Sequence, residues 1–310
     1  MLTDDGVRIE AAYEPWAGGQ AAADGGSAAT GEGASGDTDG RAVDGTGSAA
    51  NRPAIVIAHG FTGSLDRPAV QRAARAFTQH AAVVTFSFRG HGRSGGRSTV
   101  GDREVLDLAA AVRWARSLGH ARVATVGFSM GGSVVLRHAA LYLPDGSGGA
   151  DTAPGGLPET GPAGTPASPP RGGMSPGGRT EAHTDAVAAV SAPARWYYRG
   201  TAPMRRLHWV ISRPAGRLIG RYGLRTRIHS KDWDPVPLSP VEAAPLIAPT
   251  PMLIVHGDRD PYFPLDHPRS LADAADGAAE LWIEQGMGHA ENAADPQLLR
   301  RIADWLVPAR

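Results

Sequence analysis

One segment, residues 126–132 with the sequence VGFSMGG, constrains the fold of this 310-residue chain more than any other. It follows a β-branched, alternating run (122–126) and precedes a run of helical character (133–143). A G-x-S-x-G turn between a strand and a helix needs glycine on both sides of the serine, because a side chain there would collide with both elements. The segment therefore predicts a strand, a tight turn and a helix. The Ser129 hydroxyl is expected at the helix N-terminus, where backbone N–H groups favour negative charge.

The rest of the chain alternates between apolar strand patterns and amphipathic helix patterns. Residues 54–58 form a fully apolar run, which is typical of a strand buried on both faces. Further strands are expected at 7–13, 83–88, 187–190, 252–255 and 281–283, and helices at 67–79, after an Asp102 N-cap, and around 298–306. This alternation predicts an α/β fold with a mostly parallel sheet covered by helices on both faces.

Composition excludes several classes of function. Lys plus Arg and Asp plus Glu each total 31, so net charge does not favour a nucleic-acid partner. Without cysteine the chain has no disulfide, thiolate metal site or cysteine nucleophile. We find neither a secretory signal nor an apolar run long enough for an integral membrane segment, and we expect a cytoplasmic protein.

Two long segments, 17–51 and 144–183, are rich in small and polar residues and poor in large apolar ones. Such segments bury too little surface to offset the entropy of ordering, so we expect disordered, low-complexity insertions. Without them roughly 235 residues remain, which suits one domain over 1–310. Residues 192–249 lie between two predicted strands and are too long for a simple crossover, so they are expected to form a small helical cap.

Chemical groups that could assist Ser129 follow two other predicted strands. Asp258 and Asp260 come after 252–255, and His289 comes after 281–283. The carboxyl ends of parallel strands share one edge of the sheet, which is where such folds bind ligands. A serine, a carboxylate and a histidine at that edge can form a nucleophile, its base and the group that orients the base.

The motifs in order resemble those of the α/β-hydrolase fold superfamily: His59-Gly60-Phe61, the loop FRGHGRS (88–94), residues 127–132, His256-Gly257-x-x-Asp260 and Gly288-His289. The resemblance covers the chain outside the insertions and the cap. It implies that Ser129 is the nucleophile, His289 the base and Asp260 the orienting acid. It further implies that the backbone N–H groups of Phe61 and Met130 form the oxyanion hole. The sequence has no motif for a metal or nucleotide cofactor, so none is expected.

Other residues near these motifs have competing interpretations. Asp258 follows the same strand as Asp260, but the H-G-x-x-D pattern favours Asp260, and we expect Asp258 to bond its own backbone in a turn. His59 is expected to be structural, and His256 to be a satisfied core histidine. His91 and Arg93 are expected to support the glycine-rich loop.

The predicted cap is unusually aromatic and basic. From Arg195 to Lys231 there are ten basic residues and no acidic one, and 192–249 holds Trp196, Tyr197, Tyr198, Trp209, Tyr222 and Trp233. Three interpretations remain open: a solvated arginine face with Leu207, Val210 and Ile211 turned inward, a receptor for an anionic substrate, and a surface that contacts anionic lipid.

Together these features predict a cofactor-independent serine hydrolase that cleaves a carboxylic ester or a related acyl bond through an acyl-enzyme. The substrate is expected to be a small acyl compound, anionic or lipophilic. The same fold also allows an acyltransferase, a serine peptidase acting on small peptides, or a non-catalytic hydrolase-like receptor.

Overall fold

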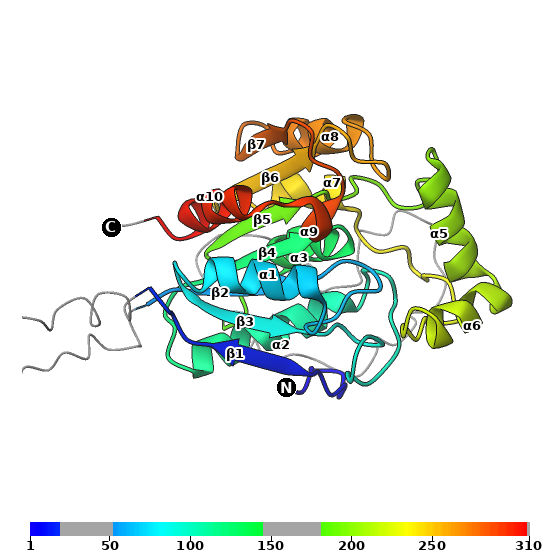
Figure 1. Ribbon diagram of the computed structural model, residues 1–310, viewed down its shortest axis with the longest axis horizontal. Helices are drawn as coiled ribbons and strands as arrows, with labels where there is room; N and C mark the ends of the chain where they lie inside the picture. The colour runs from blue at the N-terminus through cyan, green and yellow to red at the C-terminus, as the bar shows by residue number, and fades with distance from the viewer. Residues whose placement is uncertain (19–51, 145–180, 309–310) are drawn as a thin grey trace, which may run out of the picture.

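The computed structural model describes residues 1–18, 52–144 and 181–308. The described residues form a seven-stranded sheet of order β1-β3-β2-β4-β5-β6-β7 (Figure 1). All neighbouring strands are parallel except β1, which is antiparallel to β3. The strands are β1 (Ala11–Glu14), β2 (Ala54–Ala58), β3 (Ala82–Phe86), β4 (Val123–Phe128), β5 (Ala186–Val190), β6 (Met252–Gly257) and β7 (Ala279–Glu284). The predicted α/β class is therefore confirmed.

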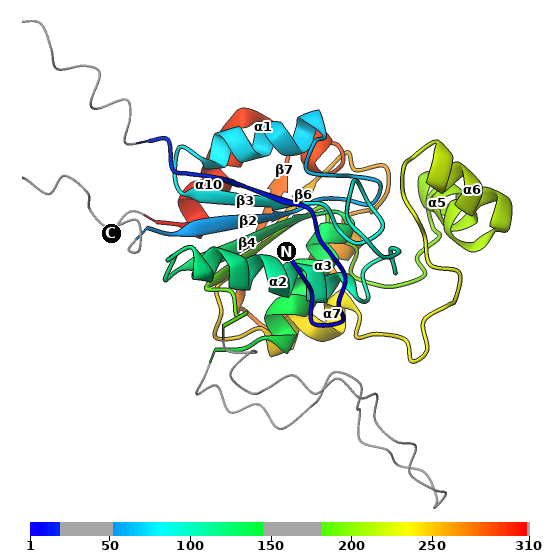
Figure 2. The ribbon, with the colours of Figure 1, turned by 90° about the horizontal axis from the view of Figure 1, so that it is seen from below.

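Helices cover both faces of the sheet, as Figure 2 shows. One face carries α1 (Pro68–Phe77) and α10 (Pro296–Leu306), and the other carries α2 (Glu104–Ser117), α3 (Met130–Leu141) and α8 (Asp266–Ala274). Every residue of β2 to β6 is buried, which explains why these strands are continuous apolar runs instead of alternating ones.

Some predicted boundaries are wrong. The expected strand at 7–13 is shorter and later, because residues before Ala11 form only an isolated bridge between Leu2 and Arg8. The strand before Ser129 continues through Phe128, and α3 begins directly at Met130. The turn around Ser129 is thus tighter than the sequence alone indicated.

Asp102 does not cap α2. The helix begins at Glu104, its N-cap position is Arg103, and no side chain caps it. Asp102 instead lies 3.5 Å from the Arg137 guanidinium. The loop before α2 is held by Glu104, whose carboxylate accepts hydrogen bonds from the backbone N–H groups of Thr99 (2.9 Å) and Gly101 (3.0 Å).

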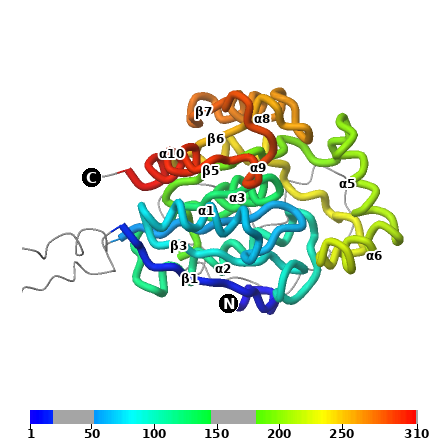
Figure 3. The backbone as a smooth tube through the Cα atoms, in the orientation of Figure 1, coloured from blue at the N-terminus to red at the C-terminus, as the bar shows by residue number. Residues whose placement is uncertain are grey.

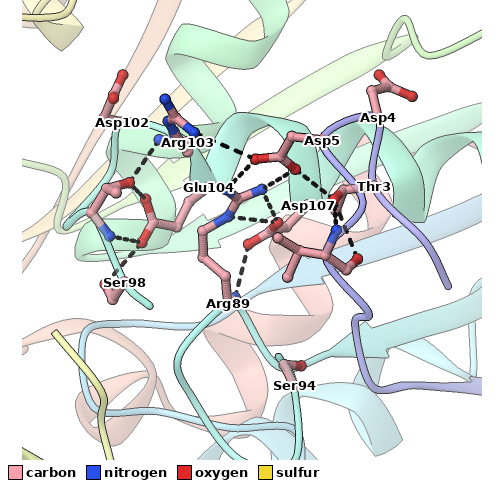
Figure 4. Close-up of polar contacts among 12 residues, drawn as sticks. Thr3, Asp4, Asp5, Arg89, Ser94, Ser98, Asp102, Arg103, Glu104 and Asp107 are labelled. Carbon is pink, nitrogen blue, oxygen red and sulfur yellow. Dashed lines mark hydrogen bonds and ion pairs between the residues drawn. The ribbon is translucent and has the colours of Figure 1, made fainter. Parts of the chain in front are cut away.

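A buried arginine joins the N-terminus, the loop after β3 and α2 (Figure 4). The Arg89 guanidinium donates to Asp107 Oδ1 from both Nε (2.9 Å) and Nη2 (2.8 Å), and also donates to Asp5. Its backbone N–H donates to Asp107 Oδ2 at 2.8 Å. These bonds fix the start of the glycine-rich loop, which packs next to the candidate site.

Between β5 and β6 the chain leaves the sheet. Figure 3 shows it running out through α5 (Ala202–Ser212) and α6 (Pro214–Tyr222), which lie apart from the helices that cover the sheet. It returns through the short α7 (Pro240–Ala243) and the 3₁₀ turn η2 (Ala244–Leu246). The predicted insertions at 17–51 and 144–183 lie almost wholly outside the described residues. Across the described ranges, no helix has both the length and the apolar character needed to cross a membrane.

Candidate active site

Ser129 lies on the strained turn between β4 and α3. Its φ is +52°, a backbone conformation that residues other than glycine rarely adopt. A Cβ added to Gly127 would lie 2.1 Å from the Gly131 carbonyl oxygen, and one added to Gly131 would lie 2.1 Å from the Ala58 carbonyl oxygen. Both glycines are therefore required by close backbone contacts, as the G-x-S-x-G pattern predicts.

The structure brings Ser129, His289 and Asp260 together. His289 Nε2 lies 2.8 Å from Ser129 Oγ, and His289 Nδ1 lies 2.7 Å from Asp260 Oδ2. Ser129 follows β4, Asp260 follows β6 and His289 follows β7, so three strand ends supply the three side chains. Because Asp260 holds Nδ1–H, Nε2 is left free to accept the serine proton.

Asp260 is held as a carboxylate. Its other oxygen, Oδ1, accepts the backbone N–H groups of Tyr262 (2.8 Å) and Phe263 (3.1 Å). Burial opposes ionisation, but the hydrogen bond and charge of His289, together with these N–H groups, hold the pKa of Asp260 below its usual value. An ionised Asp260 can stabilise an imidazolium at His289.

The backbone N–H groups of Phe61 and Met130 are the predicted oxyanion donors. Met130 is the first residue of α3, so the helix itself has no acceptor for its N–H. Phe61 belongs to the loop after β2, and its N–H donates no backbone hydrogen bond within the described residues. Both groups are therefore available as donors.

Two buried histidines hold the Phe61 loop. His59 Nδ1 donates to the Gly60 carbonyl (2.7 Å), and His59 Nε2 accepts the Phe88 N–H (3.0 Å). Burial lowers the pKa of His59 to about 3, so it stays neutral. His91 Nε2 accepts the Thr62 N–H at 3.3 Å. Both side chains bond backbone groups of the loops around the site, in keeping with their expected supporting roles.

Glu291 is a site residue that the sequence did not reveal. Its side chain is buried, and its carboxylate oxygen Oε1 lies 3.4 Å from the Gly60 N. A Cβ placed on Gly60 would lie 3.3 Å from Glu291 Oε1 and 3.4 Å from Ser129 Cβ, so Gly60 separates the two side chains. On the side of Glu291 a pocket of about 440 Å³ is lined by Phe61, Arg67, Arg72 and Glu291 among others, and Ser129 does not line it. The only sequence signal is the position of Glu291 two residues after His289.

Three further predictions meet different outcomes. Asp258 does not bond its own backbone; its Oδ1 accepts the N–H of Gly286 from the next loop at 2.6 Å. His256 is buried and its Nε2 bonds the Phe263 carbonyl at 2.8 Å, but its Nδ1 has no partner among the described residues. Arg93 is exposed and pairs with Glu10.

Aromatic rings connect the site to the segment that contains α5. The Tyr262 ring lies 4.3 Å from the His289 ring, between centroids, and Tyr198 lies 6.2 Å from Phe263. The Thr201 hydroxyl, just before α5, donates to the Tyr262 carbonyl at 2.9 Å. The base of this segment is thus attached to the loop that carries Asp260. Across the described ranges, no cluster of histidine and acidic side chains is arranged to hold a metal ion.

Comparisons with known proteins agree with this architecture. A family model described as the alpha/beta hydrolase fold matches residues 53–146. The chain is similar to the structure of an esterase of Pyrococcus furiosus, Pf2001, at 17% identity and a TM-score of 0.60, covering 99% of this chain and 87% of that one. It is also similar to Est1E of Butyrivibrio proteoclasticus with bound ferulic acid (16% identity, TM-score 0.51, 98% and 95% covered). A third similar structure is a putative alpha/beta hydrolase of Agrobacterium tumefaciens (15% identity, TM-score 0.53, 99% and 93% covered).

A search of the curated proteins found no match to the sequence. At these identities the structural likeness establishes the fold. The α/β-hydrolase fold that the five motifs predict is thereby confirmed.

Proposed function

We propose that this chain, which has the α/β-hydrolase fold, is a serine hydrolase that cleaves a carboxylic ester through an acyl-enzyme. The observation that carries the proposal is the continuous hydrogen-bonded series from Asp260 through His289 to Ser129, with spacings of 2.7 and 2.8 Å. A merely structural serine at a helix N-terminus has no need of a histidine base that a buried carboxylate orients.

The reaction follows from this geometry. Ser129 Oγ attacks the acyl carbon while its proton moves to His289 Nε2, and the carbonyl oxygen becomes an oxyanion that the N–H groups of Phe61 and Met130 stabilise. Asp260 stabilises the imidazolium. His289 then returns the proton to the alkoxy oxygen as the C–O bond breaks, and the alcohol leaves. Water, deprotonated by the same histidine, hydrolyses the acyl-enzyme to the carboxylic acid and restores Ser129.

We further propose that residues 192–249 act as a cap that shapes the substrate pocket, with the stretch from Trp196 to Thr201 nearest the chemistry. The support is the contact of this stretch with the loop that carries Asp260. Two of the similar structures are esterases or bind a carboxylic acid, ferulic acid, which is consistent with a small acyl substrate.

The proposal is tested by labelling the purified protein with a fluorophosphonate and mapping the modified peptide, together with hydrolysis of p-nitrophenyl esters of increasing acyl length. We expect the label on Ser129 alone. Ser129→Ala should lose the label and about 10⁴-fold or more of turnover. The matched control is Ser133→Ala, one turn along α3, whose hydroxyl bonds the Met130 carbonyl at 2.7 Å. A folded protein that takes no label and hydrolyses no ester would overturn the proposal in favour of a receptor.

A further inference from the structure

Helix α6 exposes the apolar face that a surface helix normally buries. Its outward residues at helical spacing are Pro214, Ala215, Leu218, Ile219 and Tyr222. Leu218, Ile219 and Tyr222 are 58%, 51% and 74% exposed. We call these five residues the α6 stripe. A helix of a globular protein usually turns such a stripe toward the core.

The reason for this orientation lies on the opposite face of α6. Gly216 and Gly220 are its buried residues. A Cβ on Gly216 would lie 2.6 Å from the Val210 Cα of α5, and one on Gly220 would lie 3.1 Å from the Ile228 side chain. The helix therefore packs through a face that has no side chains, and this close packing leaves the large apolar residues outside. Trp209 of α5 is also 46% exposed.

The charge around the α6 stripe is positive and largely uncompensated. Residues 195–231 contain ten basic side chains and no acidic one. Of these ten, only Arg195 forms an ion pair with another described residue, Asp266. Arg217 and Arg221, four residues apart, lie along one edge of the stripe, and the exposed Arg213 and Arg225 flank its two ends. The chain as a whole carries no net charge, so the positive charge is local.

We propose that the α6 stripe and its surrounding arginines dock on an anionic lipid surface. An exposed row of aliphatic and aromatic side chains bordered by arginine is the arrangement with which amphipathic helices lie in a membrane interface. Anionic headgroups complement guanidinium groups that have no carboxylate partner among the described residues, and Leu218, Ile219 and Tyr222 enter the apolar part of the interface. A solvated arginine face would leave the stripe unexplained, because its residues are neither charged nor buried.

The α6 stripe lies at the end of the molecule that contains the candidate active site. Helix α5 follows the carboxyl end of β5, at the edge of the sheet that holds Ser129 (Figure 1). The helix that docks and the edge that holds Ser129 therefore lie at the same end of the molecule (Figure 1). The docking itself does not depend on the proposed hydrolase activity.

The test is co-sedimentation of the full chain with vesicles of phosphatidylcholine alone or of phosphatidylcholine with phosphatidylserine. One variant is Leu218→Ser with Ile219→Ser, and its matched control is Leu2→Ser with Leu118→Ser, two exposed leucines elsewhere on the surface. The second variant is Arg213→Gln with Arg221→Gln, and its control is Arg269→Gln with Arg300→Gln on α8 and α10. Thermal unfolding and hydrolysis of a water-soluble p-nitrophenyl ester check that each variant is folded.

We expect binding only to vesicles that contain phosphatidylserine, and weaker binding as salt is raised. The leucine–isoleucine variant should bind about tenfold more weakly or worse. The arginine variant should bind about 25-fold more weakly, at about fivefold for each arginine. The two controls should bind like the unaltered chain. The proposal is overturned if the unaltered chain does not bind vesicles that contain phosphatidylserine. It is also overturned if the controls lose as much vesicle binding as the α6 variants. If the arginine variant loses vesicle binding and the leucine–isoleucine variant does not, the lipid proposal is also overturned, in favour of an acidic protein partner.

Discussion

At the scale of single residues, the choice between Asp258 and Asp260 decides the proposed mechanism. Asp260 contacts His289 and is buried, whereas Asp258 holds the Gly286 N–H. Asp260→Asn should lower kcat for a p-nitrophenyl ester by about 10⁴, because an amide favours the wrong imidazole tautomer and cannot stabilise the imidazolium. Asp258→Asn is the matched control and should keep most of the activity. Equal losses in the two variants would exclude Asp260 as the orienting acid.

Glu291 gives a second residue-scale prediction. Its carboxylate is the acceptor nearest the Gly60 N–H, and Gly60 precedes the candidate oxyanion donor Phe61. Glu291→Ala should therefore loosen this loop and lower kcat about tenfold with little change in KM, and Glu291→Gln, which keeps an acceptor oxygen, should restore part of the loss. Asn292→Ala, one residue further on, serves as the control. A change confined to KM would indicate that Glu291 contacts substrate instead.

These residues also show how far sequence reasoning reaches. The proximity of Ser129, Asp260 and His289 could be predicted because each follows a recognisable strand, and the carboxyl ends of parallel strands share one edge of the sheet. Glu291 could not, because its burial against Gly60 depends on a contact between residues far apart in sequence. The bond from Gly286 to Asp258 is tertiary in the same way, so local turn preferences gave the wrong partner.

At the scale of elements, the turn between β4 and α3 leaves no room for larger residues. Gly131→Ala should destabilise the protein by about 3 kcal/mol or more, because the added methyl group meets backbone, the Ala58 carbonyl, which cannot rotate away. Urea unfolding measures the loss. The control Gly95→Ala places its methyl group 3.3 Å from the nearest atom and should cost much less. A stable, fluorophosphonate-reactive Gly131→Ala protein would contradict the close approach.

The ends of elements were harder to predict than their existence. Asp102 is a good N-cap residue by type, but α2 begins at Glu104, two residues after it. The Glu104 carboxylate accepts hydrogen bonds from the backbone N–H groups of Thr99 and Gly101 and so holds the preceding loop. The orientation of α6 could not be predicted either, because the sequence pattern indicates an apolar face but not whether that face points toward the core. Gly216 and Gly220 on the opposite face determine the orientation, because they allow α6 to pack closely through that face.

At the scale of the whole molecule, burial of histidines couples folding to pH. Burial lowers the pKa of His59 and His138 to about 3 and that of His267 to about 4, against about 6.5 in the unfolded chain. Below pH 6.5 the unfolded chain therefore binds three protons at these positions that the folded one does not, and the lowered pKa values of His91, His208 and His256 act in the same direction. Asp107 works in the opposite sense, since burial raises its pKa to about 7 and the folded state keeps that proton.

These four groups together give a net uptake of about two protons on unfolding near pH 5. Their contribution to the free energy of unfolding should then fall by about 3 kcal/mol per pH unit as the pH drops from about 6 to 4.5. Asp260 adds nothing in this window, because its lowered pKa acts only below the unfolded value of about 4. Urea unfolding at a series of pH values measures the slope.

His138 allows the origin of this slope to be tested. Its ring stacks on Tyr142 with centroids 4.6 Å apart, so phenylalanine can keep the packing while removing the titrating group. His138→Phe should reduce the slope by one proton, about 1.4 kcal/mol per pH unit, and leave the stability at pH 7.5 nearly unchanged. The matched control replaces the half-buried His229, which lies outside the sheet and its covering helices, by phenylalanine in the same way. If both variants kept the slope of the unaltered chain, acid sensitivity would come from groups other than the buried histidines.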